Sequence, residues 1–320
     1  MLNRLPHILL FLCAGLCFGA EDIPWVLLEQ GKAAYEARDI ARSMELVLKA
    51  LELTEEYPEA EYWLGRLYAV QGQDVLAEEH YRRALRLALF LRVPEDEFLI
   101  SYSLAQLLLD TNRREEAEII LMELANMEGA SSRNEINFEH RGLDVLTTAG
   151  IDELVYLYRS ELHQSLQARR MLGLIAWEDG RYRSSLLHSA RTVLSLLSTA
   201  SRHYREFNSE WRFDIDLIED PKHPDRDDRY PGPTDGTADL LFLVQAYIPG
   251  LMDWMLSEGF WQQFYLLSVS LYAEGYSEIA QSLWRLMAPD GRAREEAGLW
   301  GNLAVHQLKE PFITSGSLEP

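Results

Sequence analysis

The densest gathering of side chains that could do chemistry lies at residues 213–236, in the run FDIDLIEDPKHPDRDDRYPGPTDG. Its candidate ligands are Asp214, Asp216, Glu219, Asp220, His223, Asp225, Asp227 and Asp228. Carboxylate oxygens suit calcium, so a cation site is one interpretation. However, the run lacks the D-x-[DN]-x-[DN]-G spacing, and Lys222, Arg226 and Arg229 neutralise part of its charge. We therefore interpret it as a solvated or partner-facing loop and expect no metal.

The familiar catalytic motifs are absent from the sequence. It contains no G-x-x-x-x-G-K-[ST], G-x-G-x-x-G, G-x-S-x-G or H-E-x-x-H, and no two histidines stand three or four positions apart. The neighbours Glu79-His80 and Glu139-His140 would point in different directions on a helix, so neither pair is a ready acid–base dyad. We expect His80 at the surface. The sequence predicts a protein that is not an enzyme and needs no cofactor.

The charge balance excludes one class of partner. With 30 basic and 51 acidic residues the net charge is −21, which repels phosphate backbones and argues against nucleic acid. A hydrophobic content of 48% in 320 residues is ordinary for a folded protein.

The first twenty residues, MLNRLPHILLFLCAGLCFGA, have the layout of a secretory signal peptide: an early arginine, a short apolar run and small residues. We therefore expect an exported protein of the periplasm or cell envelope. Cys13 and Cys17 are the only cysteines, so a chain without residues 1–20 has neither disulfides nor thiol chemistry. A lipid anchor on Cys13 or Cys17 is the alternative, although the preceding residues fit a lipobox poorly. Residues 238–256 are apolar but contain two aspartates and a Pro-Gly pair, which argues against a membrane helix.

The elements that would position any site repeat along the chain. The stretch GRLYAVQGQDVLAEEHYRRALRL at residues 65–87 has two helical patterns separated by Gly72. A shift of 34 residues towards the N-terminus gives a similar pair broken at Arg38-Asp39, and a shift of 40 the other way gives one broken at Asn112. Later copies are broken at Gly180 and Gly275. Without any sustained strand period, the chain is predicted to be all-α.

These hairpins resemble the tetratricopeptide repeat (TPR), a 34-residue helix–turn–helix unit with the pattern W-x-x-L-G-x-x-Y in its first helix. The resemblance is strongest over residues 25–125 and fair over 172–189 and 264–287. It implies a TPR-like α-solenoid of about five to six helical hairpins with an irregular C-terminal helical group. The expected parts begin with a signal peptide (1–20) and three repeats (24–126). Residues 133–207 are expected to form a degenerate hairpin broken at Gly150 and then a fourth repeat. A Pro/Asp-rich loop (208–236), a C-terminal helical group (237–309) whose last helix, 292–308, caps the array, and a disordered tail (310–320) follow.

In this family the inner face of the first helices lines the groove where partner peptides lie. Transferred residue by residue, the resemblance implies partner-binding roles for Trp25, Lys32, Tyr35, Tyr62, Arg66, Tyr102, Gln106, Arg170, Trp177, Tyr265 and Tyr272. Each of these side chains could instead be packed between helices. The Lys/Asn/Arg clamp of chaperone-binding repeats is not matched, because the corresponding places lack the asparagines.

Two functions follow as hypotheses. The first is an exported scaffold or adaptor that binds a protein partner in an envelope or periplasmic assembly. The alternative is a transport-associated protein that binds an apolar small molecule, which the many aromatics and the apolar residues 238–256 suggest.

Overall fold

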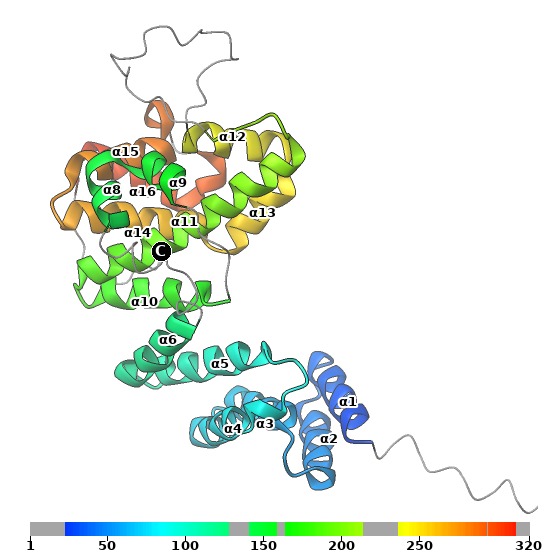
Figure 1. Cartoon of the computed structure of the whole chain (residues 1–320). Helices are drawn as coiled ribbons and strands as arrows, with labels where there is room; N and C mark the ends of the chain where they lie inside the picture. The colour runs from blue at the N-terminus through cyan, green and yellow to red at the C-terminus, as the bar shows by residue number, and fades with distance from the viewer. Residues whose placement is uncertain (1–22, 128–140, 159–163, 214–235, 293, 312–320) are drawn as a thin grey trace, which may run out of the picture. The chain divides into compact units, whose positions relative to one another are not determined.

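The computed structural model describes residues 23–127, 141–158, 164–213, 236–292 and 294–311. Within these ranges the chain is helical and no strand occurs, which confirms the predicted all-α class for this part of the chain. The chain forms two compact units, residues 1–120 (unit 1) and residues 121–320 (unit 2), and Figure 1 shows their helices. No helix in the described ranges is by itself long and apolar enough to cross a membrane.

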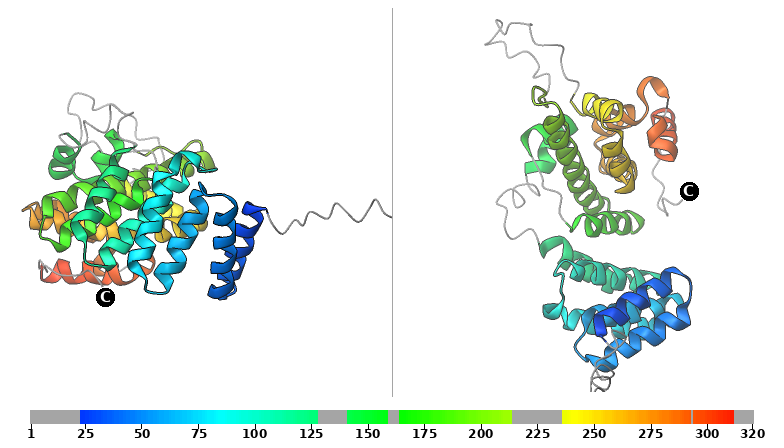
Figure 2. Two further views of the ribbon diagram at one scale, coloured as in Figure 1. Left: turned by 90° about the horizontal axis from the view of Figure 1, so that it is seen from below. Right: turned by 90° about the vertical axis from the view of Figure 1, so that its right-hand side faces the viewer.

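Unit 1 consists of short helices that pack in antiparallel neighbours, α1 on α2 and α3 on α4 (Figures 1 and 2). Its helices are α1 (Pro24–Glu36), α2 (Ile40–Leu53), α3 (Pro58–Val70), α4 (Asp74–Arg86), α5 (Asp96–Asp110) and α6 (Arg114–Met127), with a 3-10 turn, η2, at Ala88–Phe90. The boundary with unit 2 falls inside α6. Proline at the first position of α1 and α3 suits a helix start, because the missing N–H would have no partner there.

One turn geometry recurs between first and second helices. A residue with positive φ ends the first helix in each case: Arg38 (65°), Gly72 (70°), Asn112 (60°), Gly180 (71°) and Gly275 (91°). The residue after it donates its N–H to the carbonyl five positions earlier, at distances of 2.9, 3.0, 2.7, 2.8 and 2.9 Å in the same order. This left-handed cap satisfies carbonyls that the helix end leaves free. The five predicted breaks between helices are thereby confirmed.

The five hairpins also share one packing register. Seven positions before the turn residue each first helix carries a small residue, namely Gly31, Gly65, Ala105, Gly173 or Ser268. Five positions after it each second helix carries Ser43, Ala77, Ala117, Ser185 or Ala280, all with no exposed surface. Small residues at these places let the two helices of a hairpin approach closely. At Gly65, for example, a Cβ atom would lie only 2.6 Å from the Tyr81 ring.

Unit 2 repeats the hairpins and adds helices between them. Its helices are α8 (Leu143–Ala149), α9 (Ile151–Leu157), α10 (Leu166–Glu178), α11 (Tyr182–Phe207), α12 (Thr237–Tyr247), α13 (Pro249–Ser257), α14 (Phe260–Ala273), α15 (Ser277–Met287) and α16 (Gly298–Lys309), with 3-10 turns η5 (Pro289–Gly291) and η6 (Glu295–Ala297). The α10/α11 hairpin is followed in space by α14/α15, because α14 packs along α11. α16 packs on α15 and α14, and α12 lies against α11.

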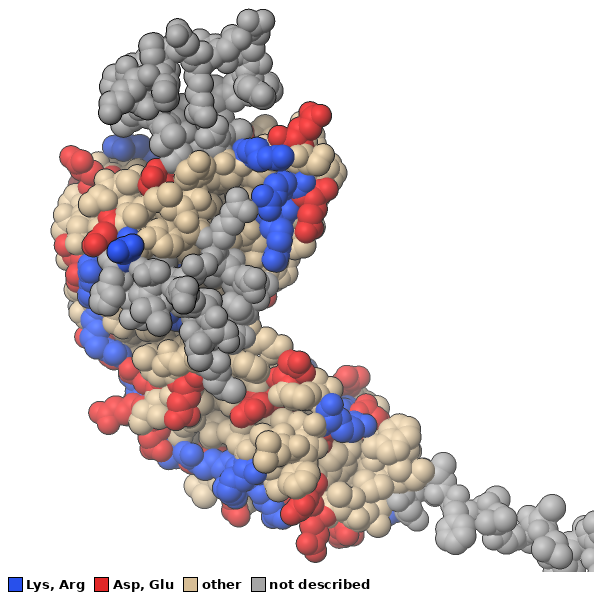
Figure 3. Space-filling view, viewed as in Figure 1, with Lys and Arg blue, Asp and Glu red and all other residues tan. Residues whose placement is uncertain are grey.

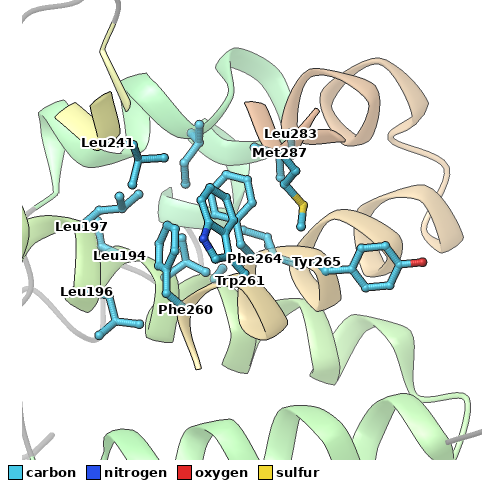
Figure 4. Packing of buried hydrophobic residues seen from close by; sticks show 14 of the residues in the cluster. Leu194, Leu196, Leu197, Leu241, Phe260, Trp261, Phe264, Tyr265, Leu283 and Met287 are labelled. Atoms are coloured by element: carbon cyan, nitrogen blue, oxygen red, sulfur yellow. The ribbon is translucent and has the colours of Figure 1, made fainter. Parts of the chain in front are cut away.

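The core of unit 2 is centred on α14. Figure 4 shows side chains of α14 among those of α11, α12 and α15: Phe260, Trp261 and Phe264 lie near Leu194, Leu197, Leu241, Leu283 and Met287. The Phe260 and Trp261 rings are 4.8 Å apart and meet edge to face. Burial of each large apolar side chain contributes about 1.5–3 kcal/mol, so this aromatic group is a main source of the stability of unit 2.

Several predicted boundaries can be compared with the helices. α11 ends at Phe207, the expected end of the fourth repeat, and α8 and α9 meet at Gly150 (φ 97°) as expected. The last helix was predicted from Arg292 but begins at Gly298, because Gly291 (φ 74°) and Gly298 (φ 50°) adopt conformations that no helix continues. The signal peptide, residues 128–140, residues 214–235 of the acidic loop and residues 312–320 lie outside the described ranges.

Candidate functional site

In unit 1 the first helices carry a row of polar side chains on the face that the TPR resemblance predicts to be the inner one, and we call this the inner face. Lys32 on α1, Arg66 on α3 and Gln106 on α5 each lie six positions before the turn residue of their hairpin. Because the hairpins share one register, these residues occupy equivalent places on the three helices. Gln106 is exposed, and Lys32 and Arg66 are half-buried. The equivalent residues of unit 2, Leu174 and Val269, are apolar.

Arg66 is surrounded by aromatic rings. Its guanidinium carbon lies 4.3 Å from the Trp63 ring centre, 5.1 Å from that of Tyr35 and 5.8 Å from that of Tyr62. Lys32 places its Nζ atom 5.7 Å from the centre of the same Trp63 ring. A cation over an aromatic face is attracted by the negative potential of the ring, by about 0.5–1 kcal/mol where water has access. We call these five residues the Arg66 cluster.

Neighbouring helices fix the cluster. Trp63 and Arg66 are three positions apart on α3, so they share a face, and the Tyr35 ring of α1 meets Trp63 edge to face at 5.5 Å. Tyr62 is buried behind them, with its ring 5.8 Å from Tyr81 of α4. The Tyr62 hydroxyl is also 3.3 Å from the Ser103 hydroxyl of α5. Tyr62 therefore joins α3 to α4 and α5, while Arg66 lies nearer the solvent.

The guanidinium group of Arg66 keeps its hydrogen-bonding capacity. Among the described residues no carboxylate or carbonyl oxygen accepts a hydrogen bond from it, whereas Lys32 is bound to Glu29 at 2.8 Å. A guanidinium group has five N–H donors in one plane and binds a carboxylate through two of them. Stacking on three rings holds that plane in place. The cluster can therefore bind carboxylate or carbonyl oxygens of another molecule.

α3 also carries a buried carboxylate, which contacts α4. The side chain of Glu61 is 1% exposed and contacts two residues of α4: it is hydrogen-bonded to His80, whose Nδ1 is 2.7 Å from its Oε2, and it forms an ion pair with Arg83, whose Nε is 3.0 Å from its Oε1. The His80 ring also stacks on Tyr68 at 5.2 Å. The prediction that His80 lies at the surface was wrong, because both partners hold its ring between the helices. Glu61 fixes α3 against α4.

The other predicted residues of unit 1 lie outside the cluster. Trp25, in the first turn of α1, is 52% exposed. Tyr102 is buried in α5, so it is a packing residue and not a free contact residue. Gln106 is exposed and donates a hydrogen bond to Asp110 at 2.8 Å, one turn further along α5. Trp25 and Gln106 are thus accessible from solvent within unit 1.

In unit 2 the predicted binding residues have structural partners of their own. Trp177 is 1% exposed and lies 5.0 Å from the Tyr182 ring. Tyr265 is 2% exposed; its hydroxyl accepts a hydrogen bond from Gln307 of α16 at 3.0 Å, and burial raises its pKa. The prediction that these two side chains face a partner is corrected, because the core encloses both of them.

Arg170 and Tyr272 are also engaged within unit 2. Arg170 is 3.4 Å from the carboxylate of Glu258, and its guanidinium lies against the backbone of Gly259, where a Cβ atom would be 2.7 Å from Nη2. Its surroundings exclude water, which lowers the pKa of Arg170. Tyr272 is half-buried, with its ring 5.5 Å from Trp284. Both residues join helices of unit 2.

Trp63 is the member of the cluster that the sequence analysis missed. The resemblance supplied inner-face positions but placed Tyr62 there rather than its neighbour. The signal was present in the spacing, because Trp63 and Arg66 are three residues apart and share a helix face.

Comparisons with known proteins add no assignment, since no protein-family model matches the sequence and a search of curated proteins finds no match. In the ranges that the structure describes, no three His, Cys, Asp or Glu side chains gather as a metal site. Most of the acidic loop, residues 214–235, lies outside those ranges. The Arg66 cluster is therefore the candidate site.

Proposed function

We propose that this protein is an exported TPR-type adaptor that binds a protein partner on the inner face of unit 1, within a cell-envelope or periplasmic assembly. The observation that carries the proposal is the Arg66 cluster, an arginine held by three aromatic rings with its donors free among the described residues. The shared turn and register of the hairpins support the TPR-like part of the proposal. The secretory layout of residues 1–20 supports export.

The composition of the cluster favours a protein as the partner. Arginine, tryptophan and tyrosine dominate the residues whose truncation costs about 2 kcal/mol or more at protein interfaces. A stable contact of this kind buries roughly 800 Å² on each side, more than the cluster alone provides. The accessible side chains Trp25 and Gln106 on α1 and α5 offer further contact area on the first helices.

The apolar-ligand alternative loses part of its motivation. The aromatic side chains of unit 2 that suggested it pack against one another: the Phe260 ring is 4.8 Å from Trp261 and 5.4 Å from Phe264. Packing in the core therefore accounts for the many aromatic side chains of unit 2 without a bound ligand. Within the described part of the chain, nothing comparable accounts for the free donors of Arg66.

Site-specific photo-cross-linking in cells of the native host tests the proposal. A photoreactive residue replaces Gln106, which is exposed on first helix α5, and in a matched variant it replaces Val75, which is 80% exposed on second helix α4. Irradiation followed by immunoblotting should give a discrete adduct from position 106 and much less of it from position 75. The adduct is then identified by mass spectrometry. Absence of any adduct at position 106, or equal adducts at both positions, would contradict a partner on the inner face.

A further inference from the structure

Two consecutive helices of unit 2 are mostly apolar, and the first of them, α12, exposes aromatic side chains as well as burying apolar ones. α12 and α13 bury Leu240, Leu241, Val244, Met252 and Met255. On the other side Phe242 is 61% exposed and Tyr247 is 58% exposed. The only charged residues of the two helices are Asp239 and Asp253. A helix that is apolar all round normally has both sides covered, and here only one side is covered by the described chain.

The exposed aromatics continue onto α11. Phe207, the last residue of α11, is 60% exposed, and its ring is 6.5 Å from that of Tyr247. This contact joins the end of α11 to the end of α12. We call Phe207, Phe242 and Tyr247 the aromatic corner. Large exposed apolar groups of this kind mark surfaces that bind another molecule.

Basic side chains lie next to the aromatic corner. α11 carries four arginines against one glutamate, in a chain whose net charge is −21. Arg202 and Arg205, in the last two turns of α11, have no acidic partner among the described residues. The glutamate of this helix, Glu206, lies 3.2 Å from Nδ1 of His203 instead. Figure 3 shows a row of Lys and Arg side chains on the right-hand side of unit 2, with Asp and Glu side chains beside it. The corner therefore combines apolar rings with positive charge that no acidic side chain of the described residues pairs.

We infer that the aromatic corner and the arginines at the end of α11 bind the surface of an anionic lipid bilayer. Phenylalanine and tyrosine rings partition into the zone between headgroups and acyl chains, and neighbouring arginines bind lipid phosphates. α12 and α13 meet at an angle of 114°, so they form no straight span. With 11 and 9 residues, each is about half as long as a bilayer core is thick, a length that suits a position in the interface.

The acidity of the whole chain does not prevent this contact. Charges in solution are screened beyond about 8–10 Å at physiological salt, so the groups beside the membrane dominate the interaction. At the corner these groups include Arg202 and Arg205. The inference rests on unit 2 alone and is independent of the partner proposed for unit 1.

Vesicle flotation of the full chain tests the inference. Vesicles of phosphatidylcholine, with and without phosphatidylglycerol, are mixed with the wild type and with two double variants, Phe242→Ser with Tyr247→Ser, and Arg202→Gln with Arg205→Gln. The wild type should float with the anionic vesicles and much less with neutral ones. The arginine variant should partition about 30-fold more weakly into the anionic vesicles. The aromatic variant should float with neither kind of vesicle beyond the level that residues 1–20 give to every protein in the set.

Matched controls separate the corner from the rest of the chain. Val75→Ser with Leu89→Ser removes two apolar side chains of unit 1 that are 80% and 98% exposed, and Arg86→Gln with Arg183→Gln removes the same charge elsewhere. Both controls keep residues 1–20, so any vesicle binding by that apolar run is the same in all proteins. Circular dichroism should show an unchanged fold for every variant. Equal flotation of the wild type and either test variant, flotation indifferent to phosphatidylglycerol, or no flotation would overturn the inference.

Discussion

α3 in unit 1 and α14 in unit 2 occupy the same place in hairpins of the same construction, yet their surroundings differ. Both end in a left-handed glycine, Gly72 and Gly275, and both face the second helix with a small residue seven positions earlier. α14 is buried on all sides, with every residue from Phe260 to Leu271 except Gln262 in the core. α3 instead leaves Trp63 and Arg66 half exposed on one face.

The comparison separates the residues that determine how a hairpin packs from the residues that determine whether its first helix is exposed. The turn and the small residues determine how the two helices of a hairpin pack. The residue six positions before the turn differs between the units: Arg66 in α3 is polar and half-buried, whereas Val269 in α14 is apolar and buried. A polar residue there marks a first helix whose inner face is open within its unit. The following predictions test this difference.

The largest loss of stability should come from truncating a core tryptophan of unit 2. Trp284 on α15 has no exposed surface, so Trp284→Ala should reduce the free energy of unfolding by about 3–5 kcal/mol. Trp25→Ala removes the same side chain from an exposed place in unit 1 and should cost about 0.5 kcal/mol or less. Guanidinium denaturation followed by circular dichroism measures both. Similar losses would mean that the two units do not differ in packing as described.

A second test compares equivalent glycines. A Cβ atom at Gly65 would lie 2.6 Å from the Tyr81 ring and 3.1 Å from the carbonyl oxygen of Ala77, so Gly65→Ala should destabilise by about 1–2 kcal/mol. At Gly173 the nearest atom, on Leu266, is 3.4 Å away. Gly173→Ala should therefore be neutral, or stabilise by up to about 1 kcal/mol through helix propensity. Thermal melting of both variants checks the difference, and a stable Gly65→Ala protein would refute the close approach in unit 1.

The pH dependence of stability should reflect a buried histidine of unit 2, His188. Burial, together with the smaller effect of the positive charges of Arg169, Arg191 and Arg181, lowers the pKa of His188 from 6.5 to about 3. Between these pH values the unfolded chain binds a proton that the folded chain does not, so acid favours unfolding. His188 should thus cost roughly 1 kcal/mol per pH unit as the pH falls from about 6 towards 4.

The substitution His188→Leu should remove this part of the slope, and His203→Gln, at an exposed place on the same helix, should not change it. Denaturation midpoints of the three proteins across that pH range provide the comparison. A slope that His188→Leu leaves unaltered would show that His188 is protonated in the folded state or exposed to water.

A small stability effect is also expected at Arg66. Arg66→Ala removes a half-exposed guanidinium that has no hydrogen-bond acceptor among the described residues, so only cation–π contacts are lost. The free energy of unfolding should fall by about 1 kcal/mol or less. A loss of several kcal/mol would identify Arg66 as a structural residue and withdraw it from the candidate site.

The sequence predicts the hairpins well because their signals are local. Each break coincides with a left-handed residue, and each seam with a small one, both visible as spacing. Which inner-face residues stay accessible depends on contacts between distant segments. Tyr265 is covered by α16, where its hydrogen-bond partner Gln307 lies 42 positions further along the chain. Arg170 is covered by Glu258, 88 positions away, and by the neighbouring Gly259. No local pattern encodes those contacts, so Tyr265 was misplaced, while Lys32, Tyr35 and Arg66 were found together.

The most direct test of the central claim measures the cross-linked adduct at position 106 in proteins that differ only at an arginine. The wild type, Arg66→Ala and the matched surface variant Arg86→Ala each carry the photoreactive residue and are expressed at equal levels in the native host. If the open inner face of unit 1 binds a partner, Arg66→Ala should reduce the adduct at least about tenfold, and Arg86→Ala should leave it unchanged. Equal adduct in all three proteins would contradict the account, because the Arg66 cluster would then have no part in binding.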